Sequence, residues 1–315
     1  MGFSGSDINA KPLLSGFAQD YASQVTGLIA RKLFPVLPVD KQDAKYPLYG
    51  KENLYVPNDD LNSNNGTPRE ATRHSELVDI HCVPHGLLET VDRQQNSERE
   101  EPMRVKEMQV VQGVVNKLLI NEEVRVKSIV ENSANGTALS GDGTASTNKW
   151  SGAGGDPFAV KKTALENLWF EPNTLVLGYN VYTALKNNPK ILAKLSSAAT
   201  QVVTKDLLKE IFEVENILIG TARSAGDKPQ RGSPSISSVW AGLCAFAYVT
   251  EDFEMPTAGR IFVEKQTDVD TEGFWVGSWF DPKPGVKGKD NYKVSLISIE
   301  KLVASDCLYT IKGCA

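Results

Sequence analysis

Cysteine and histidine are both scarce in this chain. Among 315 residues there are only four cysteines and three histidines. The cysteines are far apart and show none of the short spacings typical of zinc or redox sites: Cys82, Cys244, Cys307 and Cys314. We therefore expect reduced thiols, with neither a disulfide framework nor a structural metal site built on cysteine.

Long apolar runs and basic clusters are also missing. No stretch approaches the roughly 18 apolar residues of a membrane span, and the first residues lack the basic-then-apolar pattern of a signal peptide. These absences predict an intracellular protein with no membrane partner. The net charge of −5, without any Lys/Arg run, argues against affinity based on phosphate contacts. The 41% hydrophobic content is nevertheless enough for the core of one large or two modest domains.

The histidines are the first candidates for a metal site, because all three fall in one short stretch: His74, His81 and His85. Cys82 and Asp79 could join them as ligands. In an extended segment, however, His81 and Cys82 face opposite sides, and Pro84 prevents a helical pairing of His81 with His85. The pattern favours solvated histidines, and we predict no metal site.

Catalytic and cofactor-binding motifs are equally scarce. The glycine clusters at 141–143 and 152–155 contain neither a phosphate-loop nor a dinucleotide pattern, and no Gly-x-Ser-x-Gly elbow occurs. Gly178 lies between a predicted strand and a predicted helix, where a phosphate could bind. An α/β enzyme acting at this turn remains an alternative, although a lone glycine is more often a simple turn. We predict no catalytic residue and no cofactor. The five tryptophans favour core or interface anchors.

One long segment keeps a helical period and predicts a helix over Ser97 to Asn132. Ser97 is a suitable N-cap, and Glu98, Glu100 and Glu101 place negative charge at the start of the helix. Its apolar residues recur at spacings of three and four, with Glu122 interrupting the stripe: Met108, Val111, Val115, Leu118, Val126 and Ile129. Two shorter helices broken near Gly113 are the alternative.

A hairpin is predicted upstream of this helix. Two extended stretches, Lys45 to Val56 and Glu70 to Val83, flank a polar tip from Asn58 to Gly66. The second arm is polar on both faces, and an isolated hairpin of this kind is marginal in water. It needs a neighbour, which we expect to be another copy of the chain.

The remaining segments predict an arm, a compact α/β block and returning strands. Met1 to Asp20 is expected as an arm, and Tyr21 to Phe34 as a short amphipathic helix followed by extended chain at Pro35 and Pro38. The α/β block is expected from strands Thr174–Leu177, Ile217–Ile219 and Val239–Thr250, and from helices Phe158–Asn167, Val181–Lys186 and one capped by Thr204. Strands Ile261–Glu264, Phe274–Phe280, Tyr292–Ile299 and Cys307–Ile311 are expected to return beside the long helix.

This order of parts resembles the major capsid proteins of tailed bacteriophages, which have the Hong Kong 97 type fold. The resemblance covers nearly the whole chain. Its most specific pieces are Ile29 to Val39 running on to Lys45-Tyr46, Trp150 with Asp156-Pro157-Phe158, Pro172 to Gly178 with Val181-Tyr182, and Asn188-Pro189.

The resemblance implies an α+β fold class with an outstretched hairpin, called the E-loop, and a long spine helix. The implied divisions are an N-terminal arm (1–38), the E-loop hairpin (39–90), a peripheral domain (91–165) with the spine helix (97–132), an axial domain (166–258), and strands returning to the peripheral domain (259–315). Some family members cross-link through an E-loop lysine. Lys51 lies in that region, but a lone exposed lysine is usually a solubilising charge, so we assign it no role.

The implied function is structural. Family members assemble through hexamers and pentamers into an icosahedral head shell around double-stranded DNA, without sequence-specific binding. The expected partners are other copies of the chain, a separate scaffolding protein, a portal and decoration proteins. Assembly is expected in the host cytoplasm, and the final location is the virion. A shell protein of a cellular nanocompartment, similar to encapsulin, is the alternative with the same fold.

Overall fold

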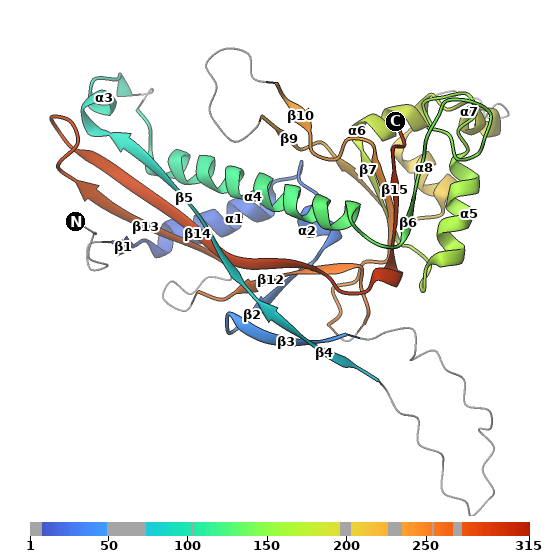
Figure 1. Ribbon diagram of the computed structural model, residues 1–315. Helices are drawn as coiled ribbons and strands as arrows, with labels where there is room; N and C mark the ends of the chain where they lie inside the picture. Colours follow the sequence, from blue (N-terminus) through green and yellow to red (C-terminus); the bar gives the residue numbers. More distant parts are fainter. Residues whose placement is uncertain are drawn as a thin grey trace, which may run out of the picture.

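The computed structural model describes residues 8–48, 74–101, 104–195, 203–225, 235–253, 255–266 and 273–315. Within these parts the chain forms two main sheets, with the long helix α4 (Glu107–Glu131) lying along one of them and ending near the other (Figure 1). None of the helices in these ranges combines the length and the apolar character that a membrane span requires.

The first sheet has six strands and carries α4 on one face. Its strand order is β1-β13-β14-β12-β2, and β5 pairs with the other edge of β14. Three of the four strands predicted at the end of the chain are present here as β12, β13 and β14, whereas β5 was not predicted. Their bounds are β1 Asn9–Ala10, β2 Val36–Val39, β5 Val83–Asp92, β12 Gly259–Glu264, β13 Phe274–Asp281 and β14 Lys289–Leu302.

The second sheet has five strands in the order β6-β15-β11-β7-β8. The predicted central strand is confirmed, since all five residues of β11 are buried between β15 and β7. The strands are β6 Gly136–Ala138, β7 Thr174–Gly178, β8 Asn216–Gly220, β11 Leu243–Ala247 and β15 Leu308–Lys312. The helices grouped around this end of the molecule in Figure 1 are α5 Pro157–Asn167, α6 Tyr179–Lys186, α7 Pro189–Leu195 and α8 Lys205–Phe212.

One predicted strand lies in a different sheet from the one expected. The segment Cys307 to Ile311 was expected beside the long helix, but β15 pairs with β11 and β6 in the five-stranded sheet. Its connection to the helix is limited to the end of α4, where the Thr310 hydroxyl donates to the carbonyl of Val130 over 3.0 Å. All four residues from Leu308 to Ile311 are buried, so periodicity alone did not reveal which sheet receives them.

The long helix is confirmed, but its predicted start is wrong. Ser97 is the last residue of a short helix, α3 (Arg93–Ser97), and α4 begins at Glu107. The side chain of Asn96 explains the interruption, because its amide bonds both the N–H of Val105 (2.8 Å) and the carbonyl of Val105 (3.2 Å). These contacts hold Val105 beside the end of α3. From Glu107 the helix is continuous through Gly113, so the alternative of a break there is also wrong.

Most of the predicted helical stripe is buried. Val111, Val115, Leu118 and Val126 belong to the main core, whereas Met108 is 53% exposed. This core lies between α4, the six-stranded sheet, the N-terminal segment and one face of the five-stranded sheet, which contributes Val176, Ala245 and Leu308. The other face of the five-stranded sheet packs with α5 to α8 in a second core. The five-stranded sheet therefore lies between the two cores.

The N-terminal segment departs from the prediction of a free arm. Helix α1 (Pro12–Gln24) packs on α4, β1 pairs with β13, and a second helix, α2 (Ala30–Leu33), follows. The helix starts at Pro12 rather than at Tyr21. Its buried residues are Leu14, Ser15, Ala18 and Ala22, and the last three are small side chains that give a weak hydrophobic signal.

The base of the predicted hairpin is an antiparallel ribbon. Strand β3 (Asp43–Leu48) pairs with β4 (Glu76–His81), in a register that runs from Asp43 opposite His81 to Leu48 opposite Glu76. This ribbon leaves the body beneath β12 (Figure 1). The predicted tip from Asn58 to Gly66, and Lys51, lie outside the described residues.

Candidate functional site

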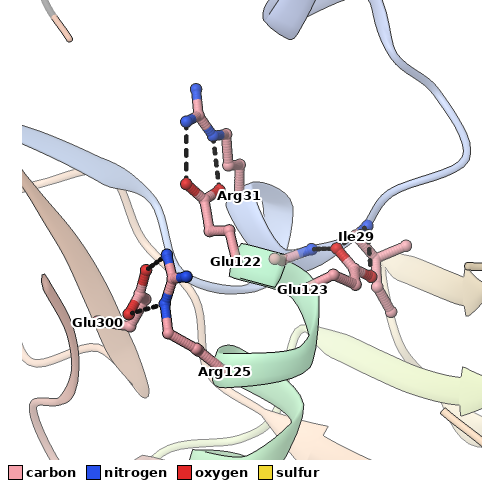
Figure 2. Close-up of polar contacts among 7 residues, drawn as sticks. Ile29, Arg31, Glu122, Glu123, Arg125 and Glu300 are labelled. Carbon is pink, nitrogen blue, oxygen red and sulfur yellow. Dashed lines mark hydrogen bonds and ion pairs between the residues drawn. The ribbon is translucent and has the colours of Figure 1, made fainter. Parts of the chain in front are cut away.

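One turn of α4 carries a carboxylate that joins three parts of the molecule. Glu123 is fully buried, and its Oε1 accepts from the indole Nε1 of Trp240 (2.6 Å) and from the backbone N–H of Ile29 (3.0 Å). Its Oε2 accepts from the N–H of Ala30 at 2.9 Å. Figure 2 shows this carboxylate pointing at the backbone that leads into α2. Burial raises the pKa of Glu123, while the three N–H donors act against this rise.

The neighbouring carboxylate is paired with an arginine of α2. Arg31 makes two bonds to Glu122, from Nε to Oε1 (2.7 Å) and from Nη2 to Oε2 (3.0 Å). The Glu122 side chain is only 2% exposed. Burial acts to lower the pKa of Arg31, but the charge of Glu122, the hydrogen bonding to it and the charge of Glu300 together outweigh burial, so the net pKa is raised. Two-point pairs of this kind fix geometry as well as charge.

A second bidentate pair fastens the same helix to the sheet. Arg125 donates from Nε (3.0 Å) and Nη2 (2.7 Å) to the carboxylate of Glu300 on β14 (Figure 2). We call Glu122, Glu123 and Arg125 with their partners the α4 cluster. The cluster fixes the N-terminal segment, the six-stranded sheet and the turn before β11 to one helix. The sequence showed Glu122 only as a gap in the stripe, and an Arg31 partner was not predicted.

The turn at Gly178, considered above for a phosphate contact, packs closely against the backbone of Trp240. A Cβ at Gly178 would lie 2.0 Å from the carbonyl oxygen of Trp240, and one at Gly220 would lie 2.4 Å from its indole ring. The absence of a side chain at both glycines therefore allows Trp240 to pack closely against them.

The histidines do not converge. His81 Nδ1 lies 2.6 Å from Asp43 Oδ1 on the exposed side of the ribbon, whereas the fully buried Cys82 faces the carbonyl of Phe262 at 3.8 Å. The two side chains thus face opposite sides, as predicted. His85 lies in β5, and burial lowers its pKa. Within the residues that the structure describes, no group of three or more His, Cys, Asp or Glu could hold a metal ion.

The root of the ribbon is a second anchor. Arg260 on β12 is 1% exposed, and its Nε donates to the hydroxyl of Tyr46 on β3 at 3.1 Å. The other guanidinium nitrogens donate to the carbonyls of Glu251 and Asp252. The ring of Tyr46 packs edge-on against Phe262, with centroids 5.2 Å apart. A buried guanidinium held on all sides makes this root rigid.

The two faces of the ribbon differ in burial, because the inner face packs on the body and the outer face is exposed. Ile80 and Cys82 are buried in a small core with Tyr46, so the second arm buries more on its own body than was expected. Burial raises the pKa of the Cys82 thiol to about 11. On the opposite face of β4, Leu77 is 62% exposed, and Asp79 is also exposed. The ribbon therefore has a fixed inner face and an open, partly apolar outer face.

The sequence matches known phage capsid proteins. The family model described as phage major capsid protein E matches residues 84–233. The major capsid protein of Burkholderia phage BcepMu is 30% identical over 242 residues, which cover 76% of each chain. Because this sequence relative is a phage protein, the phage interpretation is favoured over a cellular nanocompartment.

Solved structures share the fold. A phage-related protein from Bordetella bronchiseptica RB50 superposes with a TM-score of 0.71 at 24% identity, covering 97% of each chain. The mature capsid of bacteriophage PhiM1 superposes with a TM-score of 0.54 at 9% identity, covering 91% of this chain and 87% of that one. The fold is therefore the mixed α+β fold of phage capsids. Taken with the sequence relatives, this shows that the chain belongs to the phage major capsid protein family, whose members are structural components of the virion and not enzymes.

Proposed function

We propose that the chain assembles through hexamers and pentamers into an icosahedral head shell of the Hong Kong 97 type. In this proposal α4 is the spine helix, and the six-stranded sheet is the peripheral domain. The five-stranded sheet with α5 to α8 is the axial domain, although it also takes strands β6 and β15 from outside residues 166–258. The N-terminal segment corresponds to the arm, fastened here to its own α4.

The observation that carries this proposal is the ribbon β3–β4, the base of the proposed E-loop. Its strands pair with each other and not with either main sheet, and its root is fixed through Tyr46 and Arg260. A two-stranded ribbon gains little stability alone. The exposed face with Leu77 is thus available for a neighbouring copy, and head-to-tail contacts of this type generate closed rings.

The proposed partners follow from the same interpretation. A separate scaffolding protein, a portal and decoration proteins would act with the shell, which would be assembled in the host cytoplasm and enclose double-stranded DNA. The net charge of −5 supports enclosure without sequence-specific binding, because affinity for phosphates rests on basic contacts.

A charge on the outer face of the ribbon tests the proposal. Leu77→Asp changes a side chain that is exposed in the single subunit, so the subunit should fold and melt like the wild type. If that face packs on a neighbour, the buried aspartate should prevent shell formation, as seen by electron microscopy and sedimentation.

Deleting Asn58 to Gly66 should likewise leave a folded subunit that does not assemble.

The matched control is Asp79→Asn, which lies on the same face of β4 and keeps the size of the side chain. This variant should form normal particles. Normal shells from both Leu77→Asp and the deletion would refute the role given to the ribbon, and a stable wild-type monomer at high concentration would refute assembly itself.

A further inference from the structure

Two of the four cysteines are buried together at the centre of the five-stranded sheet. Cys244 lies on the central strand β11, and Cys314 follows β15 after Gly313. Both are 0% exposed, and both belong to the same core. The other two cysteines lie in separate cores, Cys82 at the ribbon root and Cys307 in the main core. Cys244 and Cys314 are therefore the one pair of cysteines that share a core.

The backbone fixes this pair. Gly313 has a φ of +70°, a conformation that favours glycine, and it turns the chain so that the N–H of Cys314 donates to the carbonyl of Gly242 at 3.0 Å. The carbonyl of Cys314 accepts from the N–H of Trp150 at 2.8 Å. In the register of β11 and β15, Cys244 lies directly opposite Ile311. The Cys314 thiol contacts the carbonyl of Ile311 at 3.5 Å, so it lies beside the position of Cys244.

We propose that Cys244 and Cys314 form a disulfide when the protein meets an oxidising environment. A low-molecular-weight disulfide is the oxidant. The thiolate of Cys314 attacks one of its sulfurs, which releases one thiol and leaves a mixed disulfide on Cys314. Cys244 then attacks the Cys314 sulfur, forms the Cys244–Cys314 bond and releases the second thiol. In total, two protein thiols are oxidised and one small disulfide is reduced to two thiols.

The surroundings explain why the pair would stay reduced during synthesis and oxidise slowly afterwards. Burial raises the pKa of Cys244, which keeps the thiol protonated and unreactive. The Cys314 thiol also contacts the carbonyl of Ile311 at 3.5 Å. Reaction requires a local opening of the chain after Gly313, which breaks the two backbone bonds of Cys314. The reducing cytosol opposes the bond, whereas the surroundings of a released virion favour it.

Oxidised glutathione is the probe for this bond. The full-length protein is incubated with it, remaining thiols are alkylated under denaturing conditions, and the peptides are analysed by mass spectrometry. The expected result is a peptide pair joined through Cys244 and Cys314, with Cys82 and Cys307 alkylated. The bond should raise the melting temperature by on the order of 5–10 °C, and dithiothreitol should reverse this shift.

Two serine variants separate the proposed bond from general oxidation. Cys314→Ser should lose both the linked peptides and the rise in melting temperature, whereas Cys307→Ser, at a cysteine that is equally buried, should keep both. Four alkylated cysteines in the oxidised wild type would overturn the proposal. It would also be overturned if Cys314 carried glutathione without joining Cys244, or if Cys314→Ser showed the same rise in melting temperature.

Discussion

The carboxylate of Glu123 and the indole of Trp240 meet at 2.6 Å, and this bond connects α4 to the turn that leads into the central strand of the other sheet. The same carboxylate accepts hydrogen bonds from the backbone N–H groups of Ile29 and Ala30. One buried side chain therefore holds together parts of the chain that are about 90 to 120 positions apart in the sequence.

Replacing this carboxylate should weaken the whole subunit. Glu123→Gln keeps the shape but turns an amide group towards N–H donors, which leaves at least one buried donor unpaired. We expect a loss of about 2–4 kcal/mol in the free energy of unfolding, measured by denaturant titration. Glu131→Gln on the same helix is the control, because its partly exposed pair with Lys127 should change stability by less than about 1 kcal/mol. Equal losses in both variants would contradict this role of Glu123.

The same position predicts a pH dependence. Since burial raises the pKa of Glu123, the folded state binds more protons than the unfolded state between the ordinary and the raised pKa. Stability therefore falls as pH rises through this window, and it is regained as pH falls. The stability difference between wild type and Glu123→Gln should thus shift in favour of the wild type on acidification from neutral pH to the ordinary pKa of glutamate. A shift in the opposite direction would show that the three N–H donors outweigh burial.

Which parts of this arrangement the sequence could predict depends on the range of the interactions. Strands β7 and β11 and helix α5 were found because their signals are local, such as the Asp156 cap and runs of buried residues. The start of α4 was misplaced because Asn96 bonds to Val105 nine residues away, a contact that no helical period reveals. The α4 cluster was missed for the same reason, since Arg31 and Glu122 are 91 positions apart. Helix α1 was missed because three of its four buried residues, Ser15, Ala18 and Ala22, are small and give little hydrophobic signal.

The ion pair Arg31–Glu122 should show strong coupling. Arg31→Met leaves a carboxylate that is 2% exposed without its partner, and we expect a loss of about 3–5 kcal/mol in unfolding free energy. Replacing both residues with methionine removes the uncompensated charge, so the double variant should be more stable than Arg31→Met alone. A double-mutant cycle by thermal or chemical unfolding measures this coupling. Additive losses would mean that the two side chains act independently.

Alanine substitutions at two glycines should change the stability of the protein in opposite directions. In Gly220→Ala the new Cβ would meet the Trp240 ring at 2.4 to 2.8 Å, so the ring must move away from its place against α4 and its bond to Glu123. We expect a loss of about 1–3 kcal/mol, seen in the unfolding midpoint. Gly16→Ala, in the middle of α1 with nothing within 4 Å of the new Cβ, is the matched control and should gain up to about 1 kcal/mol. Similar midpoints for the two variants would show that Trp240 is not tightly held.

The ribbon root predicts that a single hydroxyl supports shell formation. Tyr46→Phe keeps the ring against Phe262 but removes the acceptor for the buried Nε of Arg260, which should cost about 1–3 kcal/mol of stability. Because the ribbon is fixed to β12 at this point, its angle to the body should also become less defined, and the yield of closed shells should fall more than the yield of folded subunit.

Tyr21→Phe is the control, since its hydroxyl bonds Asn116 on α4, away from the ribbon, at a similar 3.0 Å. Particle yield is compared by sedimentation at matched amounts of folded subunit. If the two variants lose particles equally, the hydroxyl of Tyr46 acts through general stability and not through the direction of the ribbon.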